Sequence, residues 1–425
     1  MRTITPDIQE IQFKYKNPRG LIDILPESQR YWQHGEALLT QISSSFGYHR
    51  VITPPVEARS LYTLAFGDDF NRYLIDSNIT DGDESYVFSA HPRVSLIRSF
   101  KENGFANWPP PVHLYYQASP IQSVKDGYQQ RHFFCLDVLG ARDVTTNATM
   151  LILLRKLAQE LKLKRSSLMM HSSGCNDCRP TYNEIAEQYI KPHVGSLCES
   201  CAAHPSIANV TNCEVDAVSE WLAEAPALMD HLCPLCHSQL TSVLEACDEL
   251  GIAYDMNPLL FANCPEAEQT TFSLRINDEV IPAIIGYHYD KLATTLAEQP
   301  LTAIGLSIDM QRLTRYLEHD HASLPNQAGI QIFVAQLGQQ AKLKCLPLLH
   351  ELYEAGYSAT TASESESITH QLQVAERLRA KITLIVGQKE AVNGHVIMRD
   401  MLSGLQDNVY LDELIPVLQE RLAVV

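Results

Sequence analysis

The sequence lacks any run of roughly eighteen consecutive apolar residues, the length that a membrane-crossing helix requires. Its first six residues have no apolar stretch of the kind found in a secretory signal. Low-complexity segments are absent as well. These absences argue against a membrane protein, a secreted protein and a disordered chain. We therefore expect a cytoplasmic protein without a membrane partner.

Positive charge is also scarce. The 425 residues include 33 Lys and Arg against 50 Asp and Glu, which gives a net charge of −17 and a pI near 5.4. Because phosphate binding relies on Lys and Arg, any nucleic-acid contact must come from a local basic patch. The hydrophobic fraction of 45% is sufficient for two or three globular domains.

Cysteine, in contrast, is plentiful, and six of the eleven cysteines form three C-x-x-C pairs within one segment. Two such pairs can supply the four thiolates of a closed tetrahedral zinc site. A closed site has no open position for catalysis, so the predicted role of Zn²⁺ is structural. Whether one or two ions bind stays open: with Cys213, six or seven cysteines could hold one ion with spares, or two ions if His204 or His237 is recruited. A redox-active pair is the rival interpretation. The predicted metal ligands are Cys175, Cys178, Cys198, Cys201, Cys233 and Cys236.

Hydrophobic periodicity predicts the elements of the first part of the chain. Residues 27–46 have the pattern of an amphipathic helix, and residues 48–54 have the pattern of a strand that ends at two prolines. Two β-rich runs, residues 113–116 and 132–138, flank a polar loop and predict an antiparallel hairpin. Residues 146–163 are predicted to form a helix.

The second part of the chain has a different pattern. Strands resume at residues 271–276, and a domain boundary is expected near residues 323–329. Beyond it, β-branched runs at residues 330–334 and 382–387 are separated by helical stretches. This order is typical of a small α/β domain with parallel strands, and residues 396–401 fit a later strand of that domain.

Several motifs resemble those of histidyl-tRNA synthetases, which are class II aminoacyl-tRNA synthetases. Residues 18–27, PRGLIDILPE, are similar to the family's opening P-R-G-x-x-D-I-L-P-E, and residues 46–54 are similar to its motif 1. Residues 111–140 have the frame of motif 2, and residues 303–313 resemble motif 3. The resemblance extends from residue 18 to the C-terminus. It implies an antiparallel catalytic fold and a homodimer built through motif 1.

The same resemblance implies that catalytic residues have been lost. Gln122 stands where the family places the arginine of motif 2, and Val124 stands where it places the glutamate. The window FSAHPR, residues 88–93, corresponds to the family's L-R-P-E-G-T. His91 there replaces the acid that receives the substrate amino group. Because such groups act by electrostatic positioning, losing several should leave little activity.

Two charged positions of the family's site survive. Arg312 lies in motif 3, and Asp137 stands in place of a glutamate. An arginine that has lost its partners is more often a structural ion-pair residue than a nucleotide ligand. The windows for R-G-L-D-Y-Y and G-G-R-Y-D fall at residues 262–267 and 286–290, and neither keeps its arginine. No catalytic residue is therefore predicted, and the residual ligand-pocket candidates are Arg312, Asp137, Gln122 and His91.

The rest of the chain also resembles parts of the family. Residues 174–182 match G-C-x-x-C-R-P-x-Y, a pattern found in an insertion of some members. The C-terminal part is similar to the anticodon-binding domain. The stretch that corresponds to its basic run contains Glu364 and Glu366 and no Lys or Arg. An acidic face of this kind is a poor surface for RNA phosphates.

Together these patterns predict an α+β fold. It combines a class II synthetase antiparallel sheet core with helices, a Cys-rich zinc insertion, and a C-terminal α/β domain like an anticodon-binding domain. The expected boundaries are residues 1–171 and 250–322 for the two parts of the core, 172–249 for the insertion and 328–425 for the C-terminal domain.

Three functional hypotheses remain open. The first is a catalytically inactive paralogue that acts as a regulatory or binding subunit, as in the regulatory subunit of ATP phosphoribosyltransferase, which generally lacks the C-terminal domain. The second is a divergent ATP-dependent histidine–tRNA ligase, and the third is a tRNA-binding module without ligase activity. Under the first, the expected partners are a second copy of the chain, and a protein or small metabolite in preference to tRNA.

Overall fold

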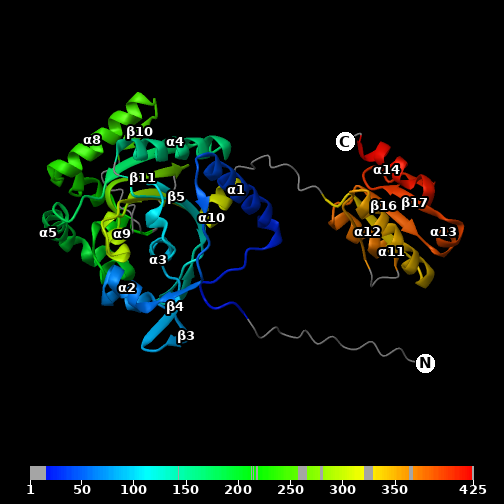
Figure 1. The fold of residues 1–425 in the computed structure, drawn as a ribbon, viewed down its shortest axis with the longest axis horizontal. Coiled ribbons are helices and arrows are strands. Elements are labelled where there is room, and N and C mark those ends of the chain that lie inside the picture. The colour runs from blue at the N-terminus through cyan, green and yellow to red at the C-terminus, as the bar shows by residue number, and fades with distance from the viewer. Residues whose placement is uncertain are drawn as a thin grey trace. The chain divides into compact units, whose positions relative to one another are not determined.

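The computed structural model describes residues 16–141, 143–211, 213, 215–216, 219–256, 266–277, 281–319, 329–362 and 367–423. The chain divides into two compact units, Met1–Ala322 and Ser323–Val425. Figure 1 labels the elements of each unit. Within the described ranges, no helix has the length and apolar character needed to cross a membrane.

An eight-stranded sheet forms the centre of the first unit, with the order β1-β5-β8-β13-β12-β11-β9-β10. All neighbours from β5 to β9 are antiparallel, and the edge strands β1 and β10 are parallel to their neighbours. The predicted α+β fold with an antiparallel core is confirmed. The strands are β1 (His49–Arg50), β5 (Val112–Ala118), β8 (Phe133–Leu139), β13 (Ala303–Asp309), β12 (Ile284–His288), β11 (Glu268–Ile276), β9 (Ser166–Ser172) and β10 (Tyr254–Met256).

Two groups of helices pack around this sheet (Figure 1). One group packs in the order α10–α1–α4–α8, and the other consists of α2, α3 and α9, which contact one another. The second group shares a buried core with β5, β12 and β13. These helices are α1 (Pro26–Ser45), α4 (Val144–Glu160), α8 (Pro234–Glu249), α10 (Met310–His319), α2 (Arg59–Phe66), α3 (Pro92–Glu102) and α9 (Asp290–Ala297).

The predicted helix at residues 27–46 is confirmed as α1. Pro26 lies in its first turn, where a missing N–H costs nothing, and Glu27 complements the positive end of the helix dipole. Its buried residues recur with the period of a helix and include Tyr31, Leu39 and Ile42. The amphipathic pattern thus places one apolar stripe against α10 and the sheet.

The predicted hairpin is also confirmed, because β5 and β8 pair antiparallel. The intervening loop contains a second, smaller hairpin that was not predicted, β6 (Ile121–Val124) and β7 (Gly127–Gln130). The strand expected at residues 48–54 extends only over β1, and prolines at positions 54 and 55 have no N–H to continue a ladder. A separate sheet has the order β2-β4-β3, with β2 (Val56–Ala58), β3 (Asp76–Asp81) and β4 (Glu84–Phe88).

The cysteine-rich segment lies between β9 and β10. It contains α5 (Arg179–Ile190), α6 (Glu199–Ala203) and α7 (Ile207–Thr211), and it ends with α8, which packs on α4 and β11. Eight buried side chains among the described residues, including Tyr182, Ile207 and Leu222, form a small core in the middle of the segment.

The second unit is a five-stranded sheet with the order β15-β14-β16-β17-β18. β15, β14 and β16 are parallel, as predicted, whereas β17 and β18 are antiparallel. Parallel neighbours need crossover helices, and helices follow β14 and β15 along the chain. The elements are β14 (Ile332–Gln336), α11 (Gln339–Glu354), β15 (Ala359–Thr361), α12 (Ile368–Arg377), β16 (Ile382–Val386), α13 (Gln388–Asn393), β17 (His395–Asp400), β18 (Gln406–Tyr410) and α14 (Leu414–Ala423).

Some of the sequence predictions fall outside the described residues. These are residues 262–265 of the window for R-G-L-D-Y-Y, and Glu364 and Glu366 of the expected RNA-facing stretch.

Candidate functional site: a filled pocket and two cysteine clusters

A row of paired residues crosses the central sheet. Leu114 on β5 pairs with Asp137 on β8, Asp137 pairs with Gly305 on β13, and Gly305 pairs with Tyr287 on β12. Directly opposed residues share one face of a sheet. Asp137 and Tyr287 therefore lie on the same face, on either side of a glycine that has no side chain.

Arg93, in the first turn of α3, fills the space above this glycine, and its side chain is 1% exposed. Its Nε donates to Asp137 Oδ1 at 3.1 Å, Nη1 donates to the Tyr287 hydroxyl, and Nη2 donates to Ser307 Oγ at 3.3 Å. The guanidinium carbon lies 4.3 Å from the ring centroid of Tyr287 and 4.7 Å from that of Tyr289. These contacts combine an ion pair, hydrogen bonds and two cation–π interactions in a fully desolvated position.

The space above Gly305 is tightly filled by neighbouring side chains. A Cβ atom at this position would lie 1.8 Å from Asp137 Oδ1 and 2.6 Å from Arg93 Nη2. Both distances are far below van der Waals contact, so the row has no room for even a methyl group. The Tyr289 hydroxyl donates a second bond to Asp137 Oδ1, at 2.8 Å.

A second carboxylate extends the network. Glu266 Oε1 accepts from the Tyr287 hydroxyl at 2.7 Å and lies 2.9 Å from His91 Nε2 and 3.9 Å from Arg93 Nη1. Burial alone would raise the pKa of Glu266, but attraction from His91 and Arg93 outweighs burial and lowers the pKa to about 2. Glu266 is therefore ionised at neutral pH.

The structure places the four ligand-pocket candidates in three settings. Asp137 and His91 belong to the buried network around Arg93. Gln122, on β6, donates from Nε2 to the carbonyl oxygen of Ala90 at 3.0 Å. Arg312 lies on α10, where its backbone N–H donates to Asp309 Oδ1 at 3.0 Å and its Nε is 3.8 Å from Asp309 Oδ2.

Four residues of the network were missed by sequence reasoning. Each falls inside a window that was interpreted only as a loss of family residues. An arginine at the start of a helix is unfavourable for the helix dipole, and that anomaly at Arg93 was the available signal for a buried partner. The missed residues are Arg93, Glu266, Tyr287 and Tyr289.

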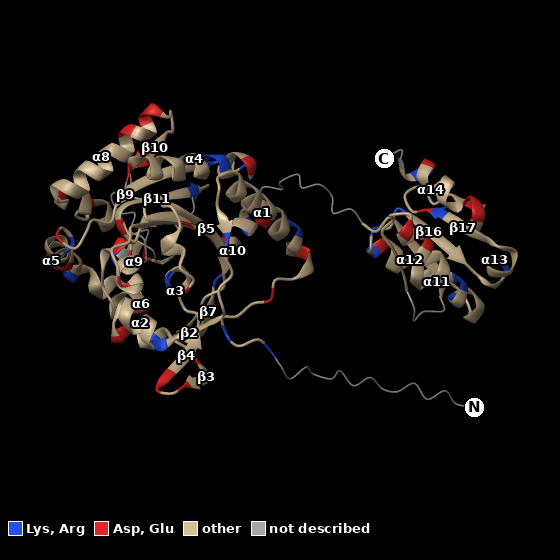
Figure 2. Cartoon of the chain, viewed as in Figure 1, with Lys and Arg blue, Asp and Glu red and all other residues tan. Residues whose placement is uncertain are grey.

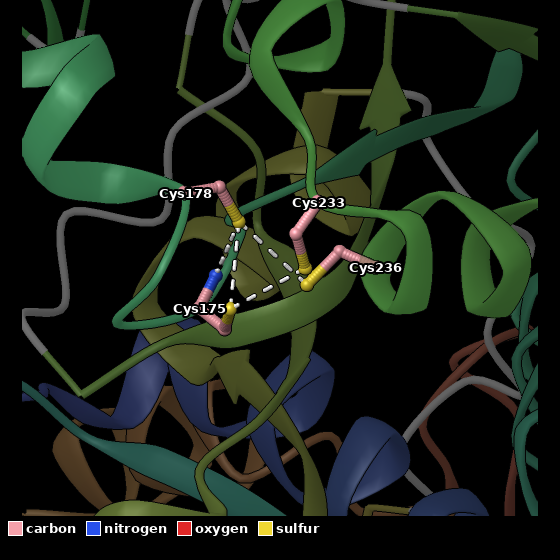
Figure 3. Close-up of side chains that lie close together, drawn as sticks. All are labelled: Cys175, Cys178, Cys233 and Cys236. Carbon is pink, nitrogen blue, oxygen red and sulfur yellow. Dashed lines mark hydrogen bonds between the residues drawn. The ribbon is translucent and has the colours of Figure 1, made fainter.

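The first and third C-x-x-C pairs come together (Figure 3). Cys175 Sγ is 3.5 Å from Cys178 Sγ and 3.8 Å from Cys233 Sγ, and Cys178 Sγ is 3.8 Å from Cys236 Sγ. Four sulfurs bound tetrahedrally at about 2.3 Å from a zinc ion would be about 3.8 Å apart. The separations match that geometry, and they are too long for disulfide bonds, which are about 2.05 Å.

Backbone N–H groups around the first C-x-x-C pair donate hydrogen bonds to its sulfur atoms, which favours the thiolate form. The N–H of Cys175 donates to Cys178 Sγ at 3.1 Å, and the N–H of Asp177 donates to Cys175 Sγ at 3.4 Å. Burial alone would raise the pKa of Cys178, but backbone donors at Cys233 and Cys175 bring it down to about 7. Gly174 has φ +63°, and a Cβ there would lie 3.1 Å from Cys178 Sγ, so glycine permits the turn from β9 into the pair.

The second pair forms a separate cluster. Cys198, Cys201, Cys213 and Asp216 each offer a ligand atom, and these atoms all lie within 4.8 Å of one another. Both clusters could thus hold a metal ion. Asp216 was missed because a single aspartate in a loop has no distinctive spacing.

Replacing Arg93 with alanine is expected to lower the free energy of unfolding by about 3–5 kcal/mol, because Asp137 would be left buried without its charge partner. All three tryptophans, Trp32, Trp108 and Trp221, lie in the first unit, so their fluorescence during urea unfolding reports on that unit. Arg155→Ala, at an exposed position on α4, is the control and should change the value by less than about 0.5 kcal/mol. Equal effects of the two substitutions would contradict the buried role of Arg93.

Glu266 predicts an acid-sensitive stability. Its pKa in the folded state is about 2, below its ordinary value, so its contribution is present above about pH 4.5 and is lost as the pH falls toward 2. Between pH 5 and pH 3 the wild type should lose about 2 kcal/mol more stability than Glu266→Gln, which does not titrate. Urea unfolding followed by tryptophan fluorescence at both pH values measures this difference. Parallel losses in the two proteins would show that Glu266 is not held ionised.

The sequence and the fold of this chain are both similar to those of known proteins. The family described as an anticodon binding domain matches residues 331–421. The chain is 27% identical over 415 residues to the histidine–tRNA ligase of Desulforamulus reducens, with 95% of this chain and 99% of the relative covered. The apo S. aureus histidyl-tRNA synthetase structure is similar with a TM-score of 0.73, at 25% identity over 95% of this chain and all of that chain.

A further solved structure, from Bacillus halodurans, is titled an ATP phosphoribosyltransferase regulatory subunit/histidyl-tRNA synthetase. It has a TM-score of 0.62 and 13% identity, over 88% of this chain and 99% of that chain, which is a likeness of fold. The relatives and the S. aureus structure span nearly the whole chain, and the domain match covers most of the second unit. Over nearly its whole length the chain is therefore similar to the histidyl-tRNA synthetases, which are class II aminoacyl-tRNA synthetases.

Proposed function

We propose that this protein is a catalytically inactive member of the family, with degenerate catalytic motifs, that works as a regulatory or binding subunit in the cytoplasm. The observation that carries the proposal is the internal pairing of the substrate-contact positions. The resemblance assigns Asp137 and His91 to substrate contacts. In this chain Asp137 instead contacts Arg93, and His91 contacts Glu266. The chain's own side chains take the place of an amino acid.

The energetic barrier to substrate binding supports this proposal. A ligand that used Asp137 would first have to separate it from Arg93, and breaking a buried ion pair costs about 3–5 kcal/mol. Since about 1.4 kcal/mol is a factor of ten, this cost weakens binding by roughly 100- to 1,000-fold or more. An active enzyme would therefore need new substrate contacts that offset the cost of breaking the Arg93–Asp137 pair.

The phosphate contacts are reduced as well. In place of the motif 2 arginine, Gln122 is a neutral side chain whose amide group is committed to the carbonyl of Ala90. Arg312 forms an ion pair with Asp309, three positions before it in the chain. An adenylating site stabilises phosphate charge with fixed positive groups, and removing one such donor typically costs a factor of ~100 to 1,000 in rate.

For partners we favour a homodimer that binds a protein or a small metabolite in preference to tRNA. Lys and Arg are scattered among Asp and Glu over the described part of each unit (Figure 2), and the net charge is −17. RNA affinity depends on clustered positive charge, so this distribution favours other ligands. The regulatory-subunit title of the Bacillus halodurans structure is a precedent for such a role on this fold.

We also propose that the cluster of Cys175, Cys178, Cys233 and Cys236 binds a structural zinc ion. Four thiolates at tetrahedral spacing form a closed site, which stabilises a fold without offering a position for substrate. The cluster joins the start of the insertion, just after β9, to the start of α8. A zinc ion there would cross-link the two ends of the segment.

The purified protein is expected to catalyse no histidine-dependent exchange of pyrophosphate into ATP. The histidine–tRNA ligase of Desulforamulus reducens, assayed in parallel, serves as the active control. Exchange above background that disappears in Arg312→Ala would instead establish a divergent ligase. Tight, salt-sensitive tRNA binding without exchange would favour the RNA-binding alternative.

Zinc removal provides a separate test of the Cys₄ cluster. Cys236→Ser should lose the zinc ion of this cluster and lower the urea midpoint of the first unit, because metal binding is coupled to folding of the insertion. Cys345→Ser, a buried cysteine of the second unit, should leave the zinc content unchanged. Metal analysis by mass spectrometry, combined with tryptophan-monitored unfolding, gives both readouts. Full zinc retention in Cys236→Ser would refute the assignment.

A further inference from the structure

The second cysteine cluster has the geometry of an independent metal site. Cys198 Sγ lies 3.8 Å from Cys213 Sγ, which is the separation of two thiolates on one tetrahedral zinc ion. Cys201 is buried, and Asp216 is only 6% exposed. Asp216 is thus held against three thiols, within the 4.8 Å that encloses all four ligand atoms.

Asp216 is fixed by the backbone. The N–H of Cys198 donates to both of its carboxylate oxygens, at 3.2 and 3.1 Å. A carboxylate has about four lone-pair positions, so it can accept this N–H and still bind a metal ion. Among metal-binding residues, ligands oriented by a second hydrogen bond are the rule. The contact therefore orients Asp216 toward the thiols.

The surrounding core gives a reason for a metal ion at this place. Cys201 belongs to the small core of the insertion, and Cys198 and Cys213 pack against it. Among the described residues, that core has eight buried members. Cores of this size rarely stabilise a domain alone, and small domains commonly add a metal or disulfides. Every described cysteine is a free thiol, which leaves a metal as the cross-link.

The two clusters connect different parts of the insertion. The Cys₄ cluster joins the two ends of the insertion, whereas the second cluster closes a loop within it, from Cys198 to Asp216. Their ligand sets share no residue, so each can fill without the other.

We propose that Cys198, Cys201, Cys213 and Asp216 form a second zinc site, of three sulfurs and one oxygen, that exchanges its metal more readily than the Cys₄ site. Thiolates are the softer ligands and favour Zn²⁺, while a carboxylate is a harder ligand that also suits Mg²⁺, Ca²⁺ and Mn²⁺. The mixed site therefore holds zinc less selectively. This proposal does not depend on the absence of catalysis.

The test uses the full-length protein purified under reducing conditions, with zinc measured by mass spectrometry. The wild type should contain two zinc ions per chain, and Cys213→Ser should contain one. Transfer of zinc to a chromogenic chelator should be biphasic in the wild type, and the fast phase should be missing in Cys213→Ser. A single ion in the wild type, or two in Cys213→Ser, would overturn the proposal.

Asp216→Asn provides a variant that keeps the shape of the side chain and its contact with the N–H of Cys198. It should speed the fast phase by roughly 10-fold or more, because even losing a residue that only orients a ligand typically costs 10- to 100-fold in metal affinity, and it should leave the slow phase unchanged. Asp230→Asn, an exposed position in the same insertion, is the matched control and should change neither phase. An unchanged fast phase in Asp216→Asn would remove the carboxylate from the site.

Cobalt substitution identifies the ligand sets even if a cysteine variant fails to fold. The wild type loaded with Co²⁺ should acquire tetrahedral absorption bands in two steps during titration. The thiolate-to-cobalt charge-transfer intensity should correspond to seven thiolates, four in one site and three in the other. An intensity that saturates after one step, at four thiolates, would exclude the second site.

Discussion

The ion pair between Arg93 and Asp137 is the interaction on which the interior of the first unit depends. It lies at the middle of the sheet, at zero exposure for Asp137, and a glycine on the neighbouring strand makes room for it. The hydroxyls of Tyr287 and Ser307 bond to Arg93 and that of Tyr289 bonds to Asp137 Oδ1, whereas Asp137 Oδ2 is buried without a hydrogen bond among the described residues. The chain's own side chains thus fill the space above Gly305.

The insertion combines a small hydrophobic core with two cysteine clusters that could each hold a metal ion. The Cys₄ cluster sits between β9 and α8, so its geometry depends on the central sheet and on the helix that packs against α4. The second cluster is supported by the small core of the insertion, to which Cys201 belongs. This difference in support, together with the different fourth ligand, explains why two clusters in one segment should differ in how readily they release metal.

Local patterns predicted much of this fold, and long-range contacts account for the rest. Helix α1 and the β5–β8 pairing follow from periodicity within each segment, and the family motifs added the order of the elements. Arg93 and Asp137 are 44 positions apart on different elements, and no spacing rule connects them. Likewise, three C-x-x-C pairs can combine in several ways. The first and third combine because α8 returns to the end of β9, a tertiary fact absent from the spacing.

A crystal structure of the protein grown with saturating histidine and ATP tests the central claim most directly. The Arg93 guanidinium should remain bonded to Asp137 and over the rings of Tyr287 and Tyr289, with no amino acid bound beside them. Histidine seated against Asp137, with Arg93 rotated out of the row, would contradict the account and return the protein to the active ligases of its family.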